Sequence, residues 1–165
     1  MGELSKQMQR DIVLIDELLS GDSEKGCVEF KHNNENPDMI GKLCSALSNV
    51  ARIEEKDFAY VIWGIEDETQ NIIGTTFDPG SKTKGNQVFI MWLSQMLTPR
   101  ITFTFRKVNH PQENLILLEI PATHTIPVEF DRTSYVRIGS ATPRLSDYPE
   151  HYQKLINSLR SYNWE

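Results

Sequence analysis

One stretch of the chain limits the possible folds more than any other. Residues 58–65 read F-A-Y-V-I-W-G-I, a nearly unbroken apolar run, and charged residues stand on both sides of it. A strand with one face in water alternates apolar and polar residues, whereas a strand buried on both faces is apolar throughout. The run therefore predicts a central strand that is buried on both faces of its sheet.

The segments around this strand predict helices and strands in irregular alternation. Apolar residues at helical spacing predict helices over 4–19, 37–50 and roughly 86–97, and a last one from Pro149 onward. Strand patterns occupy 27–31, 72–73, 101–106, 115–120, 128–130 and 135–138. Because the order does not repeat β-α-β regularly, we predict an α/β (α+β) fold, a mixed β-sheet with packed helices.

Length and charge restrict the class of protein further. We expect residues 1–165 to form a single domain, because this length is typical of one hydrophobic core. The chain has no transmembrane-length apolar run and no secretory pattern at its start, and Cys27 and Cys44 lie in apolar stretches as expected of buried free thiols. These features predict a cytoplasmic protein without a membrane partner. The net charge of −6 argues against a generic polyanion binder, so a nucleic-acid site would have to be a local patch or recruit a cation.

Two groups of acidic residues are candidates for chemistry. Glu29 and Lys31 are two apart in a predicted strand and so share one face, where the carboxylate can hold Mg²⁺ or Mn²⁺ and the ammonium can steady developing charge. The alternative is an exposed surface ion pair. Asp67 lies in an acidic cluster, 66–68, directly after the apolar strand, where a ligand site and a solvated turn are both open. Glu24, taken alone, belongs to the turn before the first strand.

Basic residues close to predicted strand ends are candidates for binding phosphates, since Lys and Arg supply most of the non-specific affinity for nucleic acids. The residues chosen are Lys31, Arg100, Arg137 and Arg144. Arg137 stands out because it lies inside an otherwise apolar strand. The stretch 82–85 lacks the Walker A pattern, and the histidines lack metal-ligand spacing, so neither a nucleotide loop nor a histidine metal site is predicted.

The ordered set of segments resembles the AlbA-like domain of the Schlafen family, which also begins many bacterial regulators. The resemblance covers about 21–145, with a helix flanking it at each end. The segments that carry it are V-E-F-K at 28–31, A-L-S-N at 46–49, W-G-I-E-D at 63–67, I-I-G-T at 72–75, L-T-P-R-I at 97–101, L-L-E-I-P at 117–121, P-V at 127–128 and Y-V-R-I-G-S at 135–140. The resemblance implies a mixed α/β fold and a nucleic-acid partner, either DNA or RNA.

The resemblance also implies a possible enzyme site. In the ribonuclease members three acids form a site that uses Mg²⁺ or Mn²⁺, and the matching positions here hold Glu24, Glu29 and Asp67, with Lys31 assisting. The chain departs from the family at 50–57, where a longer charged loop replaces the usual turn with its pair of glycines. The nuclease members also use two lobes, which a single chain of this kind could match only as a homodimer.

Three functions follow as alternatives. The first is a nucleic-acid-binding domain, part of a transcriptional regulator. The second is a metal-dependent endoribonuclease that uses the acidic triad, and the third is a protein-interaction or dimerisation module. The sequence leaves open whether the protein is an enzyme.

Overall fold

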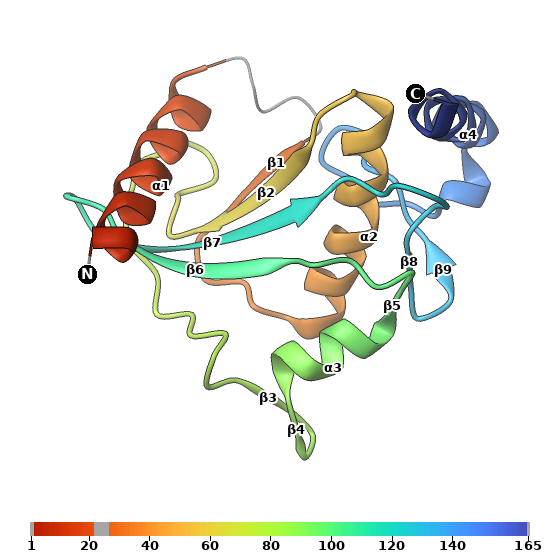
Figure 1. Cartoon of the computed structure of the whole chain (residues 1–165). Coiled ribbons are helices and arrows are strands. Elements are labelled where there is room, and N and C mark those ends of the chain that lie inside the picture. Colours follow the sequence, from red (N-terminus) through yellow and green to blue (C-terminus); the bar gives the residue numbers. More distant parts are fainter. Residues whose placement is uncertain (1, 22–26, 165) are drawn as a thin grey trace.

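The computed structural model describes residues 2–21 and 27–164 (Figure 1). The helices in these ranges are α1 (Gly2–Ser20), α2 (Pro37–Ile53), α3 (Phe89–Met96), α4 (Pro149–Trp164) and the short 3-10 helix η2 (Leu145–Asp147). The main sheet contains β1 (Val28–Lys31), β2 (Phe58–Trp63), β7 (Asn114–Pro121) and β6 (Thr104–Asn109), in that spatial order. β1 runs parallel to β2, and the other neighbours are antiparallel, so the predicted mixed sheet is confirmed.

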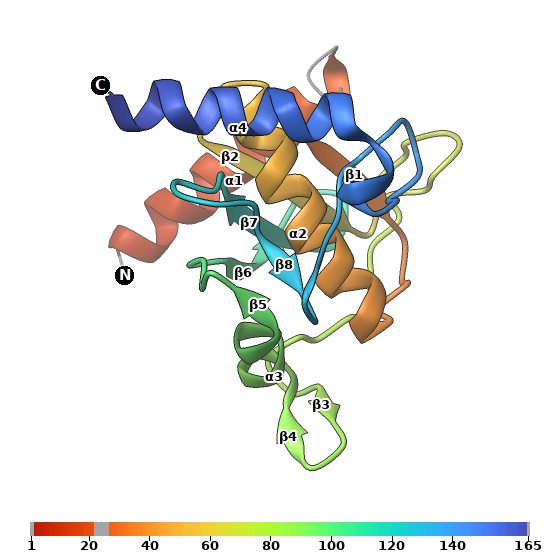
Figure 2. The same cartoon turned by 90° about the vertical axis from the view of Figure 1, so that its right-hand side faces the viewer.

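Two small sheets complete the fold. One is the hairpin of β3 (Thr83–Lys84) and β4 (Gln87–Val88), which projects with α3 away from the main sheet (Figure 2). The other contains β5 (Leu97–Thr98), β8 (Glu129–Phe130) and β9 (Thr133–Ser134). In the described parts of the chain, no helix is both long and apolar enough to cross a membrane.

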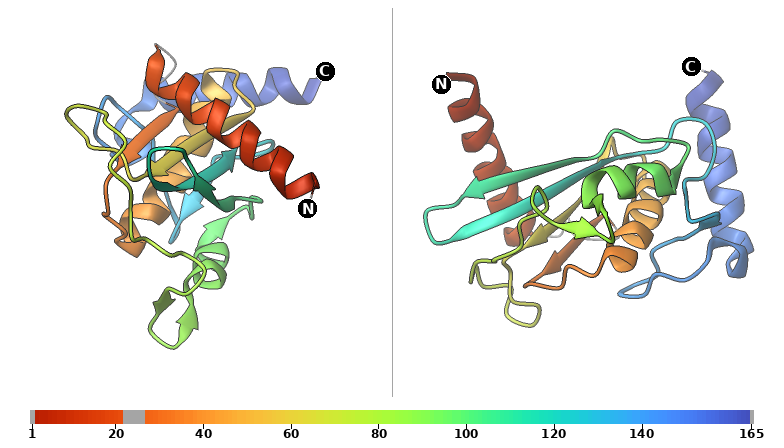
Figure 3. Two further views of the ribbon diagram at one scale, coloured as in Figure 1. Left: turned by 90° about the vertical axis from the view of Figure 1, so that its left-hand side faces the viewer. Right: turned by 90° about the horizontal axis from the view of Figure 1, so that it is seen from below.

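β2 is a central strand buried on both faces, as its apolar sequence predicts. Ile62 belongs to the apolar cluster under α1, together with Ile15 of that helix. Val61, the next residue back, belongs to the larger cluster on the other face, together with Leu47 of α2. Figure 3 shows α1 behind the sheet and α3 in front of it in the right-hand view. The alternation of neighbouring residues between two cores explains why the whole strand must be apolar.

α2 passes through the larger core, and its sequence specifies its start. Asn36 caps the helix by accepting a hydrogen bond from the Met39 backbone N–H at 3.0 Å, and Pro37 occupies the first turn, where a missing N–H costs nothing. The helix continues to Ile53, three residues past its expected end at Val50. The charged loop that departs from the family pattern is correspondingly shorter, and Glu55 within it adopts a positive φ of 58°.

Several expected strands differ from the observed ones for identifiable reasons. The strand expected at 101–106 is found at 104–109, because it pairs with β7 from the hairpin, where Asn109 lies opposite Asn114, back to Thr104 opposite Glu119. The first residues of the helix expected over 86–97 form β4 instead. The strands expected at 72–73 and 135–138 pair only through isolated bridges. Cys27 and Cys44 are both buried and free, as expected.

Candidate functional site

Glu29 and Lys31 project from β1, which is an edge strand of the main sheet. The strand alternates buried and half-buried residues, and these two are the half-buried ones. Lys31 Nζ lies 3.5 Å from Glu29 Oε2, with side chains that are 25% and 17% exposed. The expectation that both side chains share one face of the strand is therefore confirmed.

Arg137 completes an ionic cluster on this carboxylate. Its Nη2 donates to Glu29 Oε2, and its Nη1 donates to Thr142 Oγ1 at 2.7 Å. The Arg137 side chain is only 6% exposed, so the guanidinium is held in one orientation by two fixed acceptors. The Glu29 carboxylate thus contacts two cations, Lys31 and Arg137, that are more than 100 residues apart in the chain.

The cluster lies in a cleft with a volume of about 370 Å³ between β1, the first half of α2 and residues 137–142. Lys42 of α2 adds a third cation to its lining, and its Nζ lies 5.6 Å from the centre of the Tyr135 ring. Asp38 adds a second carboxylate. The charged lining therefore has one more cation than anions. Uncharged hydrogen-bonding groups come from Asn36, Ser140 and Thr142.

Buried polar residues of α2 fix the segment that carries Arg137. Ser45 Oγ donates to the Val128 carbonyl at 2.7 Å and accepts from the Tyr135 N–H at 2.9 Å. Asn49 accepts from the Val128 N–H at 2.8 Å and donates to the carbonyls of Val128 and Tyr135 at 3.2 and 2.9 Å. Both side chains are fully buried. These bonds satisfy backbone groups that no sheet would pair, and so place Arg137 against Glu29.

Residues 135–144 form an irregular hairpin, called here the basic hairpin. Tyr135 pairs with Arg144 and Ile138 with Ala141, and the turn contains Gly139 at a positive φ of 57°. Arg144 is exposed on the far strand of this hairpin, 3.4 Å from Asp147. Together with Arg132, it lines a second hollow of about 350 Å³. The basic hairpin thus contributes one arginine to the lining of each hollow, Arg137 to the cleft and Arg144 to the second hollow.

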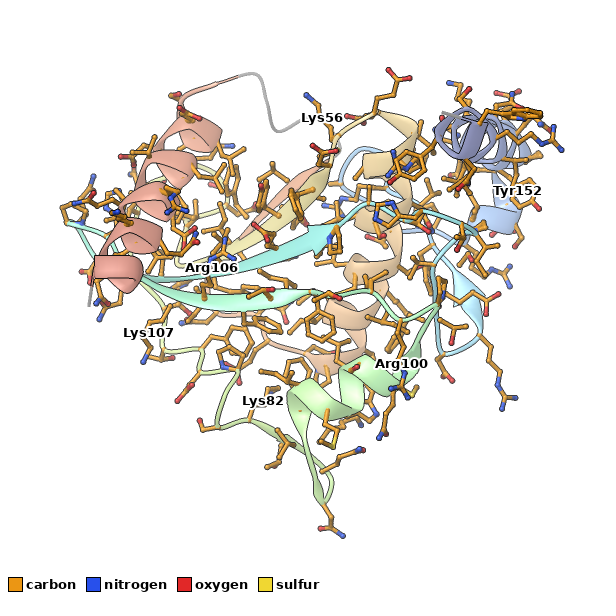
Figure 4. The ribbon with its side chains drawn as sticks, viewed as in Figure 1. Lys56, Lys82, Arg100, Arg106, Lys107 and Tyr152 are labelled. Atoms are coloured by element: carbon orange, nitrogen blue, oxygen red, sulfur yellow. The ribbon has the colours of Figure 1, made fainter. Side chains whose placement is uncertain are left out.

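Arg100 lies apart from both hollows. It is exposed just after β5 and lies beside α3 in Figure 4. Of the four basic residues chosen from the sequence, the structure brings Lys31 and Arg137 into one cleft, places Arg144 on the same hairpin and leaves Arg100 elsewhere.

Of the three acids proposed as metal ligands, the structure describes Glu29 and Asp67. Asp67 is exposed in the turn 66–70, which is closed by a hydrogen bond from the Gln70 N–H to the Glu66 carbonyl at 2.7 Å. Glu24 lies outside the described residues. Among residues 2–21 and 27–164, no three His, Cys, Asp or Glu side chains come close enough to share a metal ion. Glu29 is engaged by Lys31 and Arg137, and the metal site of the three acids stays a prediction.

Sequence reasoning gave no special weight to Lys42, Ser45 and Asn49. A signal for the last two is present, because Ser45, Ser48, Asn49 and Arg52 recur at helical spacing along α2. Polar residues at the spacing of a buried helix face indicate that their side chains form hydrogen bonds with main-chain groups of another segment. For Lys42 there is no such signal, since its place in the cleft depends on the fold.

The chain shares its sequence pattern with one family of known proteins. The sequence model of the family described as Schlafen, AlbA_2 matches residues 24–146. No curated protein matches significantly. Among solved structures, the chain is similar to the DIP2311 protein from Corynebacterium diphtheriae, with 19% identity and a TM-score of 0.47, over 82% of this chain and 26% of that one. It is also similar to the N-terminal domain of a RecG-related protein from Nitrosomonas europaea, with 17% identity and a TM-score of 0.43, over 79% of this chain and 89% of that one. The chain thus spans about a quarter of the length of DIP2311.

Proposed function

The chain belongs to the Schlafen AlbA_2 family, and from this premise we propose that it binds nucleic acid through the cleft beside β1. One observation carries the proposal: Lys31, Lys42 and Arg137 come from three separate parts of the chain and converge in a single cleft. Their convergence leaves the cleft lining with one net positive charge on a chain whose net charge is −6, and a local positive site is the arrangement that the overall charge requires.

The two kinds of cation would hold a phosphate group differently. Lys31 and Lys42 offer mobile point charges, while Arg137 offers a fixed fork whose orientation is set by Glu29 and Thr142. A phosphate oxygen entering the cleft would take hydrogen bonds from these side chains in place of water. Asn36 and Ser140, at the rim, can donate further bonds to phosphate or sugar oxygens.

Arg144 and Arg132 would extend the contact along the basic hairpin. Groups that bind phosphate do not distinguish DNA from RNA, because the 2′-hydroxyl is the discriminating group. The proposal therefore includes both nucleic acids. We further propose, on family membership alone, that the domain serves as the nucleic-acid-binding part of a cytoplasmic regulator, acting singly or as a homodimer.

Fluorescence anisotropy with labelled tRNA and with DNA of matched length tests the proposal. The double variant Lys31→Gln/Lys42→Gln should bind more weakly. The slope of log K against log salt should become shallower by roughly 1.4–1.8, because two phosphate contacts are lost. The matched control is Lys154→Gln/Arg160→Gln, which removes the same charge from exposed positions of α4. Equal affinities of the cleft variant and the control would refute binding through the cleft. If the wild type binds neither nucleic acid, a protein-interaction module is favoured instead.

Metal-dependent cleavage of RNA is the second candidate, and it rests on the pairing of Glu29 with Lys31. The family acids Glu24, Glu29 and Asp67 would hold the ion, and the ion would supply an activated water. Because Glu29 is engaged by Lys31 and Arg137, we place binding ahead of cleavage. Incubating labelled tRNA with the protein in Mn²⁺ or in EDTA, beside an Asp67→Ala control, separates the two: cutting that needs Mn²⁺ and is lost in the control establishes a nuclease.

A further inference from the structure

Acidic residues are absent from one long segment of an otherwise acidic chain. Between Asp78 and Glu113 the sequence has no Asp or Glu, while it contains Lys82, Lys84, Arg100, Arg106 and Lys107. The remaining residues hold 12 Lys and Arg against 23 Asp and Glu. No acidic residue within the segment therefore offsets its positive charge, although the whole protein has a negative net charge.

The segment also forms one continuous part of the structure. It runs through β3, β4, α3 and β5 and ends in the edge strand β6 (green to blue-green in Figure 1). The hairpin β3–β4 and α3 project from the sheet together (Figure 2). In Figure 4, Lys82, Arg100 and Lys107 lie on the side of β6 that faces α3, whereas Lys56 lies at the opposite side of the molecule. We call this side, formed by residues 79–112, the acid-free surface.

Two of its five cations are already neutralised by acids from other segments. Arg106 points to the α1 face of the sheet, where it forms ion pairs with Asp11 at 2.8 Å and Glu119 at 3.1 Å. Lys82 Nζ binds Glu35 Oε1 at 3.1 Å. Within the described residues, no carboxylate lies within 4.0 Å of the side-chain nitrogens of the other three. Lys84, Arg100 and Lys107 are exposed and remain available to a ligand.

Aromatic and apolar side chains accompany these charges. Lys84 Nζ lies 5.5 Å from the centre of the Trp92 ring, which positions the ammonium group without neutralising it. Val88 and Met91 beside it are 52% and 58% exposed. Cations next to exposed apolar groups suit a nucleic-acid strand, whose phosphates need the charges and whose sugars and bases contact the apolar atoms.

The acid-free surface adjoins the cleft through its first lysine. Lys82 is bound to Glu35, and the next residue, Asn36, lines the cleft and caps α2. Resting on the proposed function, we infer that a nucleic-acid strand held in the cleft continues onto the acid-free surface, where Lys84, Arg100 and Lys107 bind its phosphates. The second surface supplies cations that the cleft, with two carboxylates among its five charges, does not.

The test compares three proteins in the anisotropy assay with labelled tRNA, over a series of salt concentrations. The surface variant is Lys84→Glu/Arg100→Glu/Lys107→Glu, and the control Lys56→Glu/Lys154→Glu/Arg160→Glu changes the net charge equally at exposed positions elsewhere. The surface variant should bind at least tenfold more weakly than the control, with a salt slope lower by roughly 2–3. Affinity equal to that of the control overturns the inference.

A second test uses the unaltered protein, so its result does not depend on whether a triple variant folds. Acetylation of surface lysines, followed by mass spectrometry, should show Lys84 and Lys107 protected by tRNA while Lys56 and Lys154 react as before. Lack of protection at both overturns the inference. If the cleft variant loses binding while the surface variant matches its control, only this inference falls. If the wild type binds no nucleic acid, the proposed function falls with it.

Discussion

Replacing Glu29 by Gln should strengthen the binding of nucleic acid. The Glu29 carboxylate accepts from Arg137 and lies 3.5 Å from Lys31 Nζ, so it competes with a phosphate for both cations and repels it. Gln keeps the shape and one acceptor oxygen but removes the negative charge. Both cations then remain in the cleft without the anion that competes with the ligand.

The size of the effect follows from Coulomb's law. A phosphate oxygen hydrogen-bonded to Lys31 would lie about 6 Å from the carboxylate, since the 3.5 Å ion-pair distance adds to a normal hydrogen bond of ~2.8 Å. The repulsion at this separation is ~0.7 kcal/mol with the dielectric constant of water and ~2.8 kcal/mol at an effective value of ~20. Because the cleft is open and salt screens it, we expect the lower half of this range, an affinity gain of about 3–20-fold.

The gain is measured by anisotropy with tRNA in EDTA, beside the control Glu150→Gln, which removes one charge from the exposed first turn of α4. Loss of its charged partner leaves Arg137 buried, so the variant should also unfold at a lower temperature than the wild type. An affinity that is unchanged or lower, in a variant shown to be folded, would refute the electrostatic reasoning. A loss of binding that appears only in Mn²⁺ would instead indicate that Glu29 is a metal ligand.

Three further predictions concern the fold that supports the cleft. Gly41→Ala should lower the free energy of unfolding in urea by ~1–3 kcal/mol, because a Cβ there overlaps the Phe130 ring, although Ala is ordinarily ~1 kcal/mol better than Gly in a helix. Asn49→Ala leaves two backbone groups unpaired, the Val128 N–H and the Tyr135 carbonyl, because Ser45 still donates to the Val128 carbonyl, and it should cost ~2 kcal/mol or more in the same assay, with Asn157→Ala on exposed α4 as control. Burial raises the pKa of the Cys27 thiol from 9.0 to about 12, so stability is lost as pH rises through that window, by up to ~1.4 kcal/mol per pH unit. Urea unfolding at about pH 8 and pH 10.5 should show a larger loss for wild type than for Cys27→Ala, and equal losses would contradict the burial argument.

The elements that were predicted well are those whose sequence alone satisfies their packing. β2 is apolar almost throughout, and α2 has one apolar face that joins the larger core, so Ile62 and Leu47 indicate their environment without reference to any partner. The strand expected at 101–106 lies three residues further along the chain, because its position depends on pairing with β7, which begins at the hairpin with Asn109 opposite Asn114. Alternation of Phe103 and Phe105 reports which residues face the core, and it does not report where a neighbouring strand stops.

The candidate site was predictable in part for the same reason. Glu29 and Lys31 are close in sequence, so strand geometry alone places them together. Arg137 was singled out as a charge within an apolar strand, but its partner could not be identified, because the contact spans 108 residues of sequence. Lys42 has the appearance of any exposed lysine on a helix, and only the position of the basic hairpin brings it into the cleft.

The way the basic hairpin is attached has a consequence for how relatives of this protein can differ. Ser45 and Asn49 bind main-chain atoms of Val128 and Tyr135, and main-chain atoms are present whatever side chains the segment carries. Residues 139–141 at the tip are exposed, and the space around Gly139 is open. The tip can therefore change in length and charge while its anchor stays intact, so ligand preference can diverge between relatives on an unchanged scaffold, and the hairpin is a suitable position for grafting loops.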